Sequence, residues 1–248
     1  MPDLLTLEGV VAGYAGAPVL HGVDLAIPEG EISVILGANG VGKTTTLRTA
    51  AALLRPWKGQ VVFAGRRVDR MTPERLVREG VGVVPEPPAV FADLTVIDNL
   101  RVGGFALRGS RRAVEDRVQE LLASFPRLEE RADQAAGSLS GGERRTLALA
   151  RALMGSPRLL LVDEASMGLS PTAVATVFSL IEGLRGGGVT VCMVEQNVSV
   201  LDIADRAFVM EKGQIVHQAA GDLSGVREAV TNAYLGADGR PSRRRSRV

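Results

Sequence analysis

Residues 37–44 read GANGVGKT, a spacing of glycines and one lysine that suits the binding of a polyphosphate. The glycines let the backbone curl with its N–H groups facing inward, and a following helix adds positive potential at its N-terminus. The Lys43 ammonium can then reach the β- and γ-phosphates of a nucleotide, and the Thr44 hydroxyl can ligate Mg²⁺. The predicted nucleotide-binding residues of this loop are Gly37, Asn39, Gly40, Gly42, Lys43, Thr44 and Thr45.

Two adjacent carboxylates, Asp163 and Glu164, follow the apolar run 159–162. At a strand end, Asp163 can bind Mg²⁺ through water, and Glu164 can activate a water molecule for attack on a γ-phosphate. With Lys43 as a third charged group, the set favours phosphoryl transfer to water or conformational work over redox chemistry. A plain strand cap is the alternative, which the phosphate-binding loop upstream disfavours.

The segment LSGGERR, residues 139–145, places Ser140, Gly141 and Gly142 immediately before an expected helix. A helix start of this kind presents free N–H groups and can bind a second anion. A turn with an ordinary helix cap is the alternative. Because the segment lies shortly before the strand that carries the two carboxylates, we predict a second phosphate contact.

Polar residues also follow the apolar run 189–194, where the chain continues with Glu195, Gln196 and Asn197. Such a cluster is either a solvated loop cap or one wall of an active site. Cys192, the single cysteine of the chain, lies inside the run. We expect it to be a small buried hydrophobic side chain, which cannot form an internal disulfide and fits a reducing cytoplasm.

The elements that must position these residues alternate between wholly apolar strands and helices. Buried strands are expected at 31–37, within 76–86, at 158–164 and at 189–195, and helices at 44–54, 143–154 and 171–185. Strands that are apolar throughout favour a parallel sheet covered on both faces. We predict an α/β fold: a P-loop NTPase core with a mainly parallel sheet, an N-terminal antiparallel β-subdomain and an inserted α-helical subdomain at about 88–140.

Length and composition set the broad limits. The 248 residues suit one α/β domain, expected to span 1–236, followed by an Arg-rich tail at 237–248. We expect the tail to be disordered, with contact to anionic lipid as the weaker alternative. A formal net charge of +1 gives no global field that favours nucleic acid. No apolar run reaches the roughly 18 residues that a membrane span requires.

The motifs GANGVGKTT, LSGGE and LLLVDE occur in the order found in the ATP-binding subunits of ABC transporters, which the chain resembles over residues 4–236. The resemblance implies ATP and Mg²⁺ as cofactors and a site completed by a second subunit. In that family the LSGGE segment of one subunit closes over ATP held by the other, which implies that Ser140, Gly141 and Gly142 contact the partner's γ-phosphate. It further implies that Tyr14 stacks on adenine, with packing on an edge strand as the alternative reading.

Two departures from the wider family indicate one branch. Glu86 stands where a Mg²⁺- and γ-phosphate-sensing Gln is usual, and Gln196 stands where a switch His is usual. With these two residues the chain resembles the ATPases of branched-chain amino acid importers, and the ATPases of urea and short-amide importers are close alternatives. We predict Thr44, Glu86 and Asp163 at the metal, and Lys43, Glu164 and Gln196 as catalytic residues. The Gln196 amide can donate a hydrogen bond to phosphate, but it cannot become cationic near neutral pH.

The resemblance also implies partners. We expect a second ABC ATPase subunit (a paralogue or a second copy), two membrane permeases, an indirect link to an extracytoplasmic binding protein, and a peripheral position on the cytoplasmic face of the membrane. A soluble, non-transport ABC ATPase is disfavoured, because the chain has one P-loop and no long coiled-coil insertion. Segment 86–100, with Phe91 and Leu94, is expected to grip a permease helix or else to pack within its subdomain. The pair Gly103 and Gly104 is either a hinge or a tight packing contact.

Overall fold

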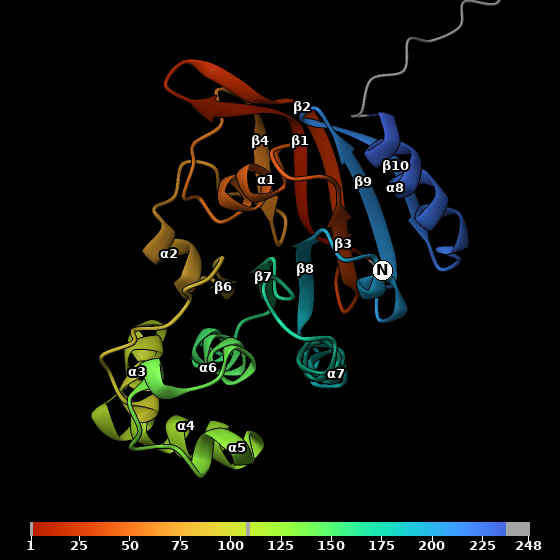
Figure 1. Cartoon of the computed structure of the whole chain (residues 1–248). Helices are drawn as coiled ribbons and strands as arrows, with labels where there is room; N and C mark the ends of the chain where they lie inside the picture. The colour runs from red at the N-terminus through yellow and green to blue at the C-terminus, as the bar shows by residue number, and fades with distance from the viewer. Residues whose placement is uncertain (1, 108–109, 237–248) are drawn as a thin grey trace, which may run out of the picture.

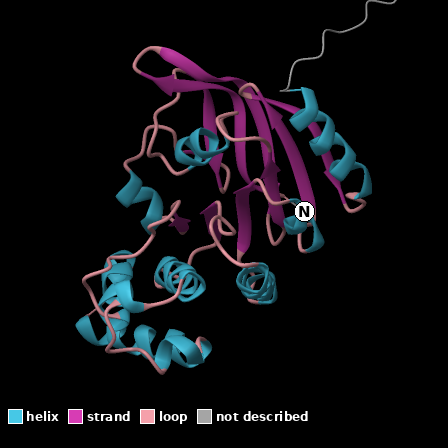
Figure 2. Cartoon of the chain, in the orientation of Figure 1, coloured by secondary structure: helices cyan, strands magenta, loops and turns pink. Residues whose placement is uncertain are grey.

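Two sheets and two sets of helices make up the computed structural model, which describes residues 2–107 and 110–236 (Figure 1). The predicted tail at 237–248 lies outside the described residues. Strands gather in the upper part of the view in Figure 2, and most helices lie below and beside them. No helix in the described ranges is long and apolar enough to cross a membrane.

The larger sheet has the strand order β10-β9-β3-β8-β7-β6. Its strands are β3 (Ile32–Leu36), β6 (Val81–Val84), β7 (Leu159–Asp163), β8 (Thr190–Glu195), β9 (Arg206–Glu211) and β10 (Gln214–Ala220). All neighbours pair in parallel except β10, which runs antiparallel to β9. Alternate residues of each central strand enter two different cores; in β7, Leu160 and Val162 enter one and Leu159 and Leu161 the other. This double burial explains why the central strands are mostly apolar; Ser33 in β3 and Thr190 in β8 are buried polar exceptions.

The smaller sheet is antiparallel, with the order β2-β1-β4-β5. Its strands are β1 (Asp3–Tyr14), β2 (Ala17–Pro28), β4 (Lys58–Phe63) and β5 (Arg66–Arg67). Helix α1 (Lys43–Ala50) contacts β1 and β2 of this sheet and β7 and β8 of the larger one. One of the two cores therefore lies around α1 between the sheets.

The remaining helices pack into the other core, apart from α2, whose buried Leu76 enters the core around α1. They are α2 (Pro73–Arg78), α3 (Val96–Gly103), α4 (Arg111–Ser124), α5 (Pro126–Glu129), α6 (Gly141–Leu153), α7 (Pro171–Gly186) and α8 (Ser224–Gly236), with short 3₁₀ turns η1 (Gly104–Ala106), η2 (Ala136–Ser138) and η3 (Val198–Asp202). Helices α6 and α7 lie under the larger sheet, and α3, α4 and α5 form a separate group beside α6 (Figure 1). The predicted fold, with its antiparallel β-subdomain and inserted helical subdomain, is confirmed.

Helix α1 is shorter than the 44–54 predicted from its apolar run. Ala52 takes a left-handed conformation with φ 56°, and the N–H groups of Leu53 and Ala52 bond back to the carbonyls of Arg48 and Thr49. This is a Schellman ending, which closes a helix whatever the hydropathy of the residues that follow. An alanine in the place usually held by glycine hid the helix end from the sequence pattern.

The pair Gly103 and Gly104 is a packing contact. A Cβ on Gly103 would lie 2.4 Å from the carbonyl oxygen of Arg151, and one on Gly104 would lie 2.8 Å from Val114 Cγ1. Neither glycine has a positive φ, so the backbone conformation does not require glycine at these positions. Glycine is needed because Gly103 lies close to α6 and Gly104 lies close to α4.

Candidate nucleotide-binding and hydrolysis site

The carboxyl ends of four parallel strands meet at one edge of the larger sheet. Leu36 pairs with Glu195, and Asp163 pairs with Val194, so the phosphate-binding loop, the two carboxylates and the polar end of β8 start from neighbouring positions. Strand β6 pairs with β7 and leads to Glu86 on the same edge. Open α/β sheets bind ligands at this edge, outside the carboxyl ends of their strands.

A pocket of about 310 Å³ opens at this edge. Its wall combines residues from β1, β2, the loop before α1, α1 itself and the ends of β6 and β7: Tyr14, Val19, Asn39, Gly40, Gly42, Lys43, Thr44, Thr45, Arg48, Glu86 and Glu164. The structure thus brings together most of the residues predicted to bind the nucleotide. Gly40 and Gly42 have φ values of 80° and 114°, which supports the prediction that this loop depends on glycine conformations.

Lys43 is only 4% exposed, and its ammonium is held at the base of the pocket. It donates to the carbonyl oxygens of Gly37 (3.0 Å) and Ala38 (3.2 Å) and lies 3.3 Å from Glu164 Oε1. Gly37 itself is not among the described residues that line the pocket. A Cβ at this position would lie 2.5 Å from the Met210 carbonyl oxygen, so Gly37 brings the loop close to β9.

The Thr44 hydroxyl donates to Asp163 Oδ1 at 3.0 Å, which places the two predicted metal ligands side by side. Burial raises the pKa of the Asp163 carboxyl; Glu164 and Glu86 raise it further, and the Thr44 hydrogen bond opposes them. Negative potential and hard oxygen donors fit Mg²⁺, which binds one or two protein oxygens and completes its shell with water and substrate phosphates. In the described ranges no three His, Cys, Asp or Glu side chains cluster into a metal site.

Tyr14 lies at the rim of the pocket with 43% of its surface exposed. Its hydroxyl oxygen accepts a hydrogen bond from Arg48 Nη1 at 3.3 Å. We did not predict Arg48 from the sequence, although its position four residues after Thr44 puts both on one face of α1. Arg48 adds positive charge beside the predicted adenine platform.

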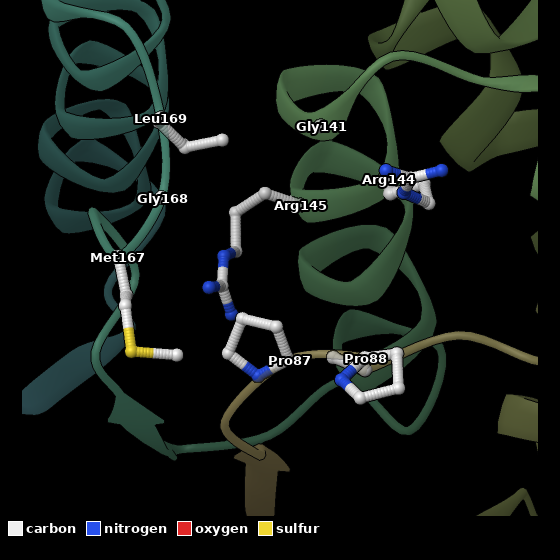
Figure 3. Close-up of a pocket in the computed structure, with 9 residues that line it drawn as sticks. Pro87, Pro88, Gly141, Arg144, Arg145, Met167, Gly168 and Leu169 are labelled. Carbon is white, nitrogen blue, oxygen red and sulfur yellow. The ribbon is translucent and has the colours of Figure 1, made fainter.

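The segment around Ser140 lies at a different pocket of the same chain. Ser140 caps α6 and forms a capping box with Glu143: each backbone N–H bonds to the other side chain, at 3.3 and 2.8 Å. Gly141 lines a pocket of about 280 Å³ together with Pro87, Pro88, Ala89, Arg144, Arg145, Met167, Gly168 and Leu169 (Figure 3). The described pocket at the phosphate-binding loop includes none of Ser140, Gly141 and Gly142 in its wall.

Gln196 is exposed at the end of β8, and it is not among the described residues of the nucleotide pocket wall. The neighbouring Glu195 is 1% exposed. Burial raises the pKa of Glu195, while hydrogen bonds from Ser166 oppose that shift. The polar cluster predicted at the end of β8 contains Glu195, but its contact with Ser166 was not predictable, because it joins positions 29 residues apart.

Arg145 is a further residue of this site that was not predicted from the sequence. It is 4% exposed, and its Nη2 donates to the Glu164 carbonyl oxygen at 2.9 Å. Figure 3 shows its side chain reaching from α6 towards the loop that carries Met167 and Leu169. Burial lowers the pKa of Arg145, and the carboxylates of Glu195, Asp163 and Glu164 act against this shift. This arginine joins the helix of the LSGGE segment to the strand end that carries the predicted base.

This fold is that of an ABC transporter ATPase. Residues 20–167 match the ABC transporter family, and the chain belongs to it. It is 42% identical over 94% of its length to the whole of the high-affinity branched-chain amino acid transport ATP-binding protein BraG of Pseudomonas aeruginosa. A probable branched-chain amino acid transport ATP-binding protein, LivF of Archaeoglobus fulgidus, is 35% identical over 82% of this chain and 86% of its own length. The lipopolysaccharide export system ATP-binding protein LptB of Escherichia coli is 33% identical over 94% of this chain and 98% of its own.

Solved structures agree with this assignment. An ABC transporter cassette in its ADP conformation superposes with a TM-score of 0.85 at 26% identity, covering 95% of this chain and 100% of the other. A dimeric cassette in a post-hydrolysis state, bound to ADP and Pi, superposes with a TM-score of 0.79 at 25% identity, covering 88% and 99%. The prediction of an ATP hydrolase of the ABC transporter class is confirmed.

Proposed function

We propose that this chain is the ATP-binding subunit of an importer of branched-chain amino acids and that it hydrolyses MgATP at an interface between two ATPase subunits. The observation that carries the proposal is the convergence of Lys43, Thr44, Asp163 and Glu164 in and beside one pocket. The relative at 42% identity, aligned over its whole length and named for branched-chain amino acid transport, supports the substrate class over the export role named for the relative at 33%.

Each predicted residue has a role in this proposal. Lys43 binds the β- and γ-phosphates, Tyr14 supports the adenine, and Glu164 takes a proton from the attacking water. Thr44 and Asp163, with Glu86 nearby, would hold Mg²⁺, which supplies charge neutralisation on the phosphates. Gln196 senses the γ-phosphate by an amide hydrogen bond.

The separation of the two pockets supports a dimeric site. The nucleotide pocket contains the phosphate-binding loop and Glu164, whereas Gly141 lines the other pocket. A second subunit that brings its own Ser140, Gly141 and Gly142 over the nucleotide would complete the site with the N-terminus of its α6. The dimeric relative bound to ADP and Pi offers a precedent for such an assembly. Whether the partner is a second copy or a paralogue is decided by which chain co-purifies.

The functional test is to purify the chain with its membrane partners and measure ATP hydrolysis in the presence of leucine, isoleucine, valine or urea. We expect stimulation by the three amino acids through the binding protein, and no stimulation by urea. Glu164→Gln should lower kcat by about 100-fold or more, because it removes the general base. Stimulation by urea alone would replace the proposed substrate, and an unchanged rate in Glu164→Gln would remove the proposed mechanism.

A further inference from the structure

The proposed hydrolysis leaves one buried carboxylate beside the site without a role. Glu195 ends β8 and is 1% exposed. Both of its oxygens accept hydrogen bonds from one residue: the Ser166 N–H donates to Oε1 at 2.9 Å, and the Ser166 hydroxyl donates to Oε2 at 2.7 Å. A carboxylate at this depth loses much of its hydration, so the two hydrogen bonds from Ser166, a backbone hydrogen bond from Asn197 and the nearby charge of Arg145 stabilise it there.

Ser166 lies two residues after Glu164, in a loop that is strained at its first residue. Glu164 has φ 47°, a left-handed conformation that side chains larger than glycine rarely adopt. Such a conformation persists only where the surrounding contacts over-determine it. The Glu164 N–H donates to the Val194 carbonyl oxygen at 3.0 Å, and its own carbonyl oxygen accepts from Arg145. The Ser166–Glu195 pair is therefore a third attachment of the same short loop.

We propose that Glu195 is a positioning residue for hydrolysis: its two-point grip on Ser166 fixes the loop that carries Glu164 against the strand end that carries Gln196. Glu164, the proposed base, and Gln196, the proposed phosphate sensor, then stay in a fixed position relative to each other. This inference rests on the proposed roles of Glu164 and Gln196. It adds a residue that touches neither nucleotide nor water and acts only through its neighbours.

Nucleotide binding provides the contrast. Lys43 is held by the Gly37 and Ala38 carbonyl oxygens as well as by its ion pair with Glu164, and Tyr14 is held by Arg48, so neither relies on Glu195 alone for its position. Loss of the grip should therefore lower kcat and leave KM and the Kd for ATP almost unchanged. A displacement of about 1 Å at a reacting group can cost up to about 100-fold in rate.

The experiment measures kcat, KM for MgATP and the Kd for ATP in the full chain assembled with its membrane partners. Glu195→Ala and Ser166→Ala should each lower kcat by about 10-fold or more while KM stays within about 2-fold. Ser166→Thr keeps the hydroxyl and Glu195→Gln keeps an acceptor for the Ser166 N–H, so both should retain most of the wild-type kcat. The double alanine variant should lose no more than either single variant, because both remove the same contact.

Asp69 provides a matched control. It is also a buried carboxylate (6% exposed) that accepts from an arginine, Arg67, and from a backbone N–H, but it lies beside β4 and β5. Asp69→Asn should leave kcat unchanged. Wild-type kcat in Ser166→Ala and Glu195→Ala together with inactivity of Glu164→Gln would overturn this inference alone. Activity of Glu164→Gln at the wild-type level would overturn the proposed function instead.

Discussion

Gln196 stands at the switch position where the wider family usually has a histidine, whose imidazole can titrate near neutral pH. A glutamine amide has no proton to gain near neutral pH, so the kcat of the native protein should show no inflection from this position. Gln196→His should introduce one near pH 6.5, the ordinary pKa of an imidazole. Gln196→Ala should lower kcat by about 10-fold or more through loss of a hydrogen bond to phosphate. The measurement is ATP hydrolysis by the assembled transporter from pH 5.5 to about 9; a wild-type rate in the alanine variant would contradict the sensing role.

Cys192 makes a second prediction at the scale of single residues. Burial raises the pKa of its thiol to about 12, and its neighbours on β3 and β7 enclose it. Because the thiolate is the reactive form, a thiol reagent should fail to label the native protein at pH 8 and should label it fully in denaturant. Mass spectrometry of the labelled chain measures this directly. Rapid native labelling would mean that β8 is accessible from solvent.

The Gly103 contact gives a prediction about elements. Gly103→Ala places a Cβ against the backbone of α6, which cannot shift without moving the helix, so it should destabilise the fold by about 1–3 kcal/mol. Gly183→Ala in α7 is the matched control, because a Cβ there meets nothing within 4 Å. That substitution should stabilise the protein by about 0.5–1 kcal/mol through helix propensity. Denaturant unfolding measures the free energy of unfolding of both variants, which should change in opposite directions. An unchanged free energy of unfolding in Gly103→Ala would show that α3 and α6 can move apart to accept the Cβ.

Helices and strands were predictable from the sequence where a hydrophobic pattern over a few consecutive residues determined them. Each central strand is mostly apolar because both of its faces are buried, and that apolar run can be recognised in the sequence. The Schellman ending at Ala52 was not, because alanine carries no signal for a left-handed residue. Contacts across the fold were equally hidden: Arg145 with the Glu164 carbonyl and Ser166 with Glu195 depend on how strands and helices pack. The motif residues were found because their chemistry is encoded over a few consecutive positions.

The surface around Phe91 supports a prediction about the whole transporter. Phe91 is 50% exposed, its ring lies 4.9 Å from the Arg151 guanidinium, and its backbone is held on both sides by the buried Asn99 amide. We expect this surface to receive a permease helix. Phe91→Asp should therefore abolish substrate-stimulated hydrolysis and uptake in vesicles, while ATP binding stays within about 2-fold of wild type.

Val216 on β10 supplies the control for that substitution. It is 53% exposed and lies on the far edge of the larger sheet, so Val216→Asp should leave uptake unchanged. Phe91→Ala separates loss of the ring from gain of a charge beside Arg151. Normal uptake in both Phe91 variants would mean that the segment only packs within its own subdomain.

Helix α6 carries a consequence for force transmission. Its first turn begins at Ser140, and near its last turn Arg151 donates to the Ala89 carbonyl oxygen while stacking on Phe91. Between these ends lies a single rod of about 20 Å. A helix resists compression along its axis far better than a loop does, so a push from a permease on Phe91 would move Ser140 as part of the same rigid body. Movement of the permease would then reach the nucleotide held by the partner ATPase subunit through one rigid helix. No series of separate conformational changes would be needed.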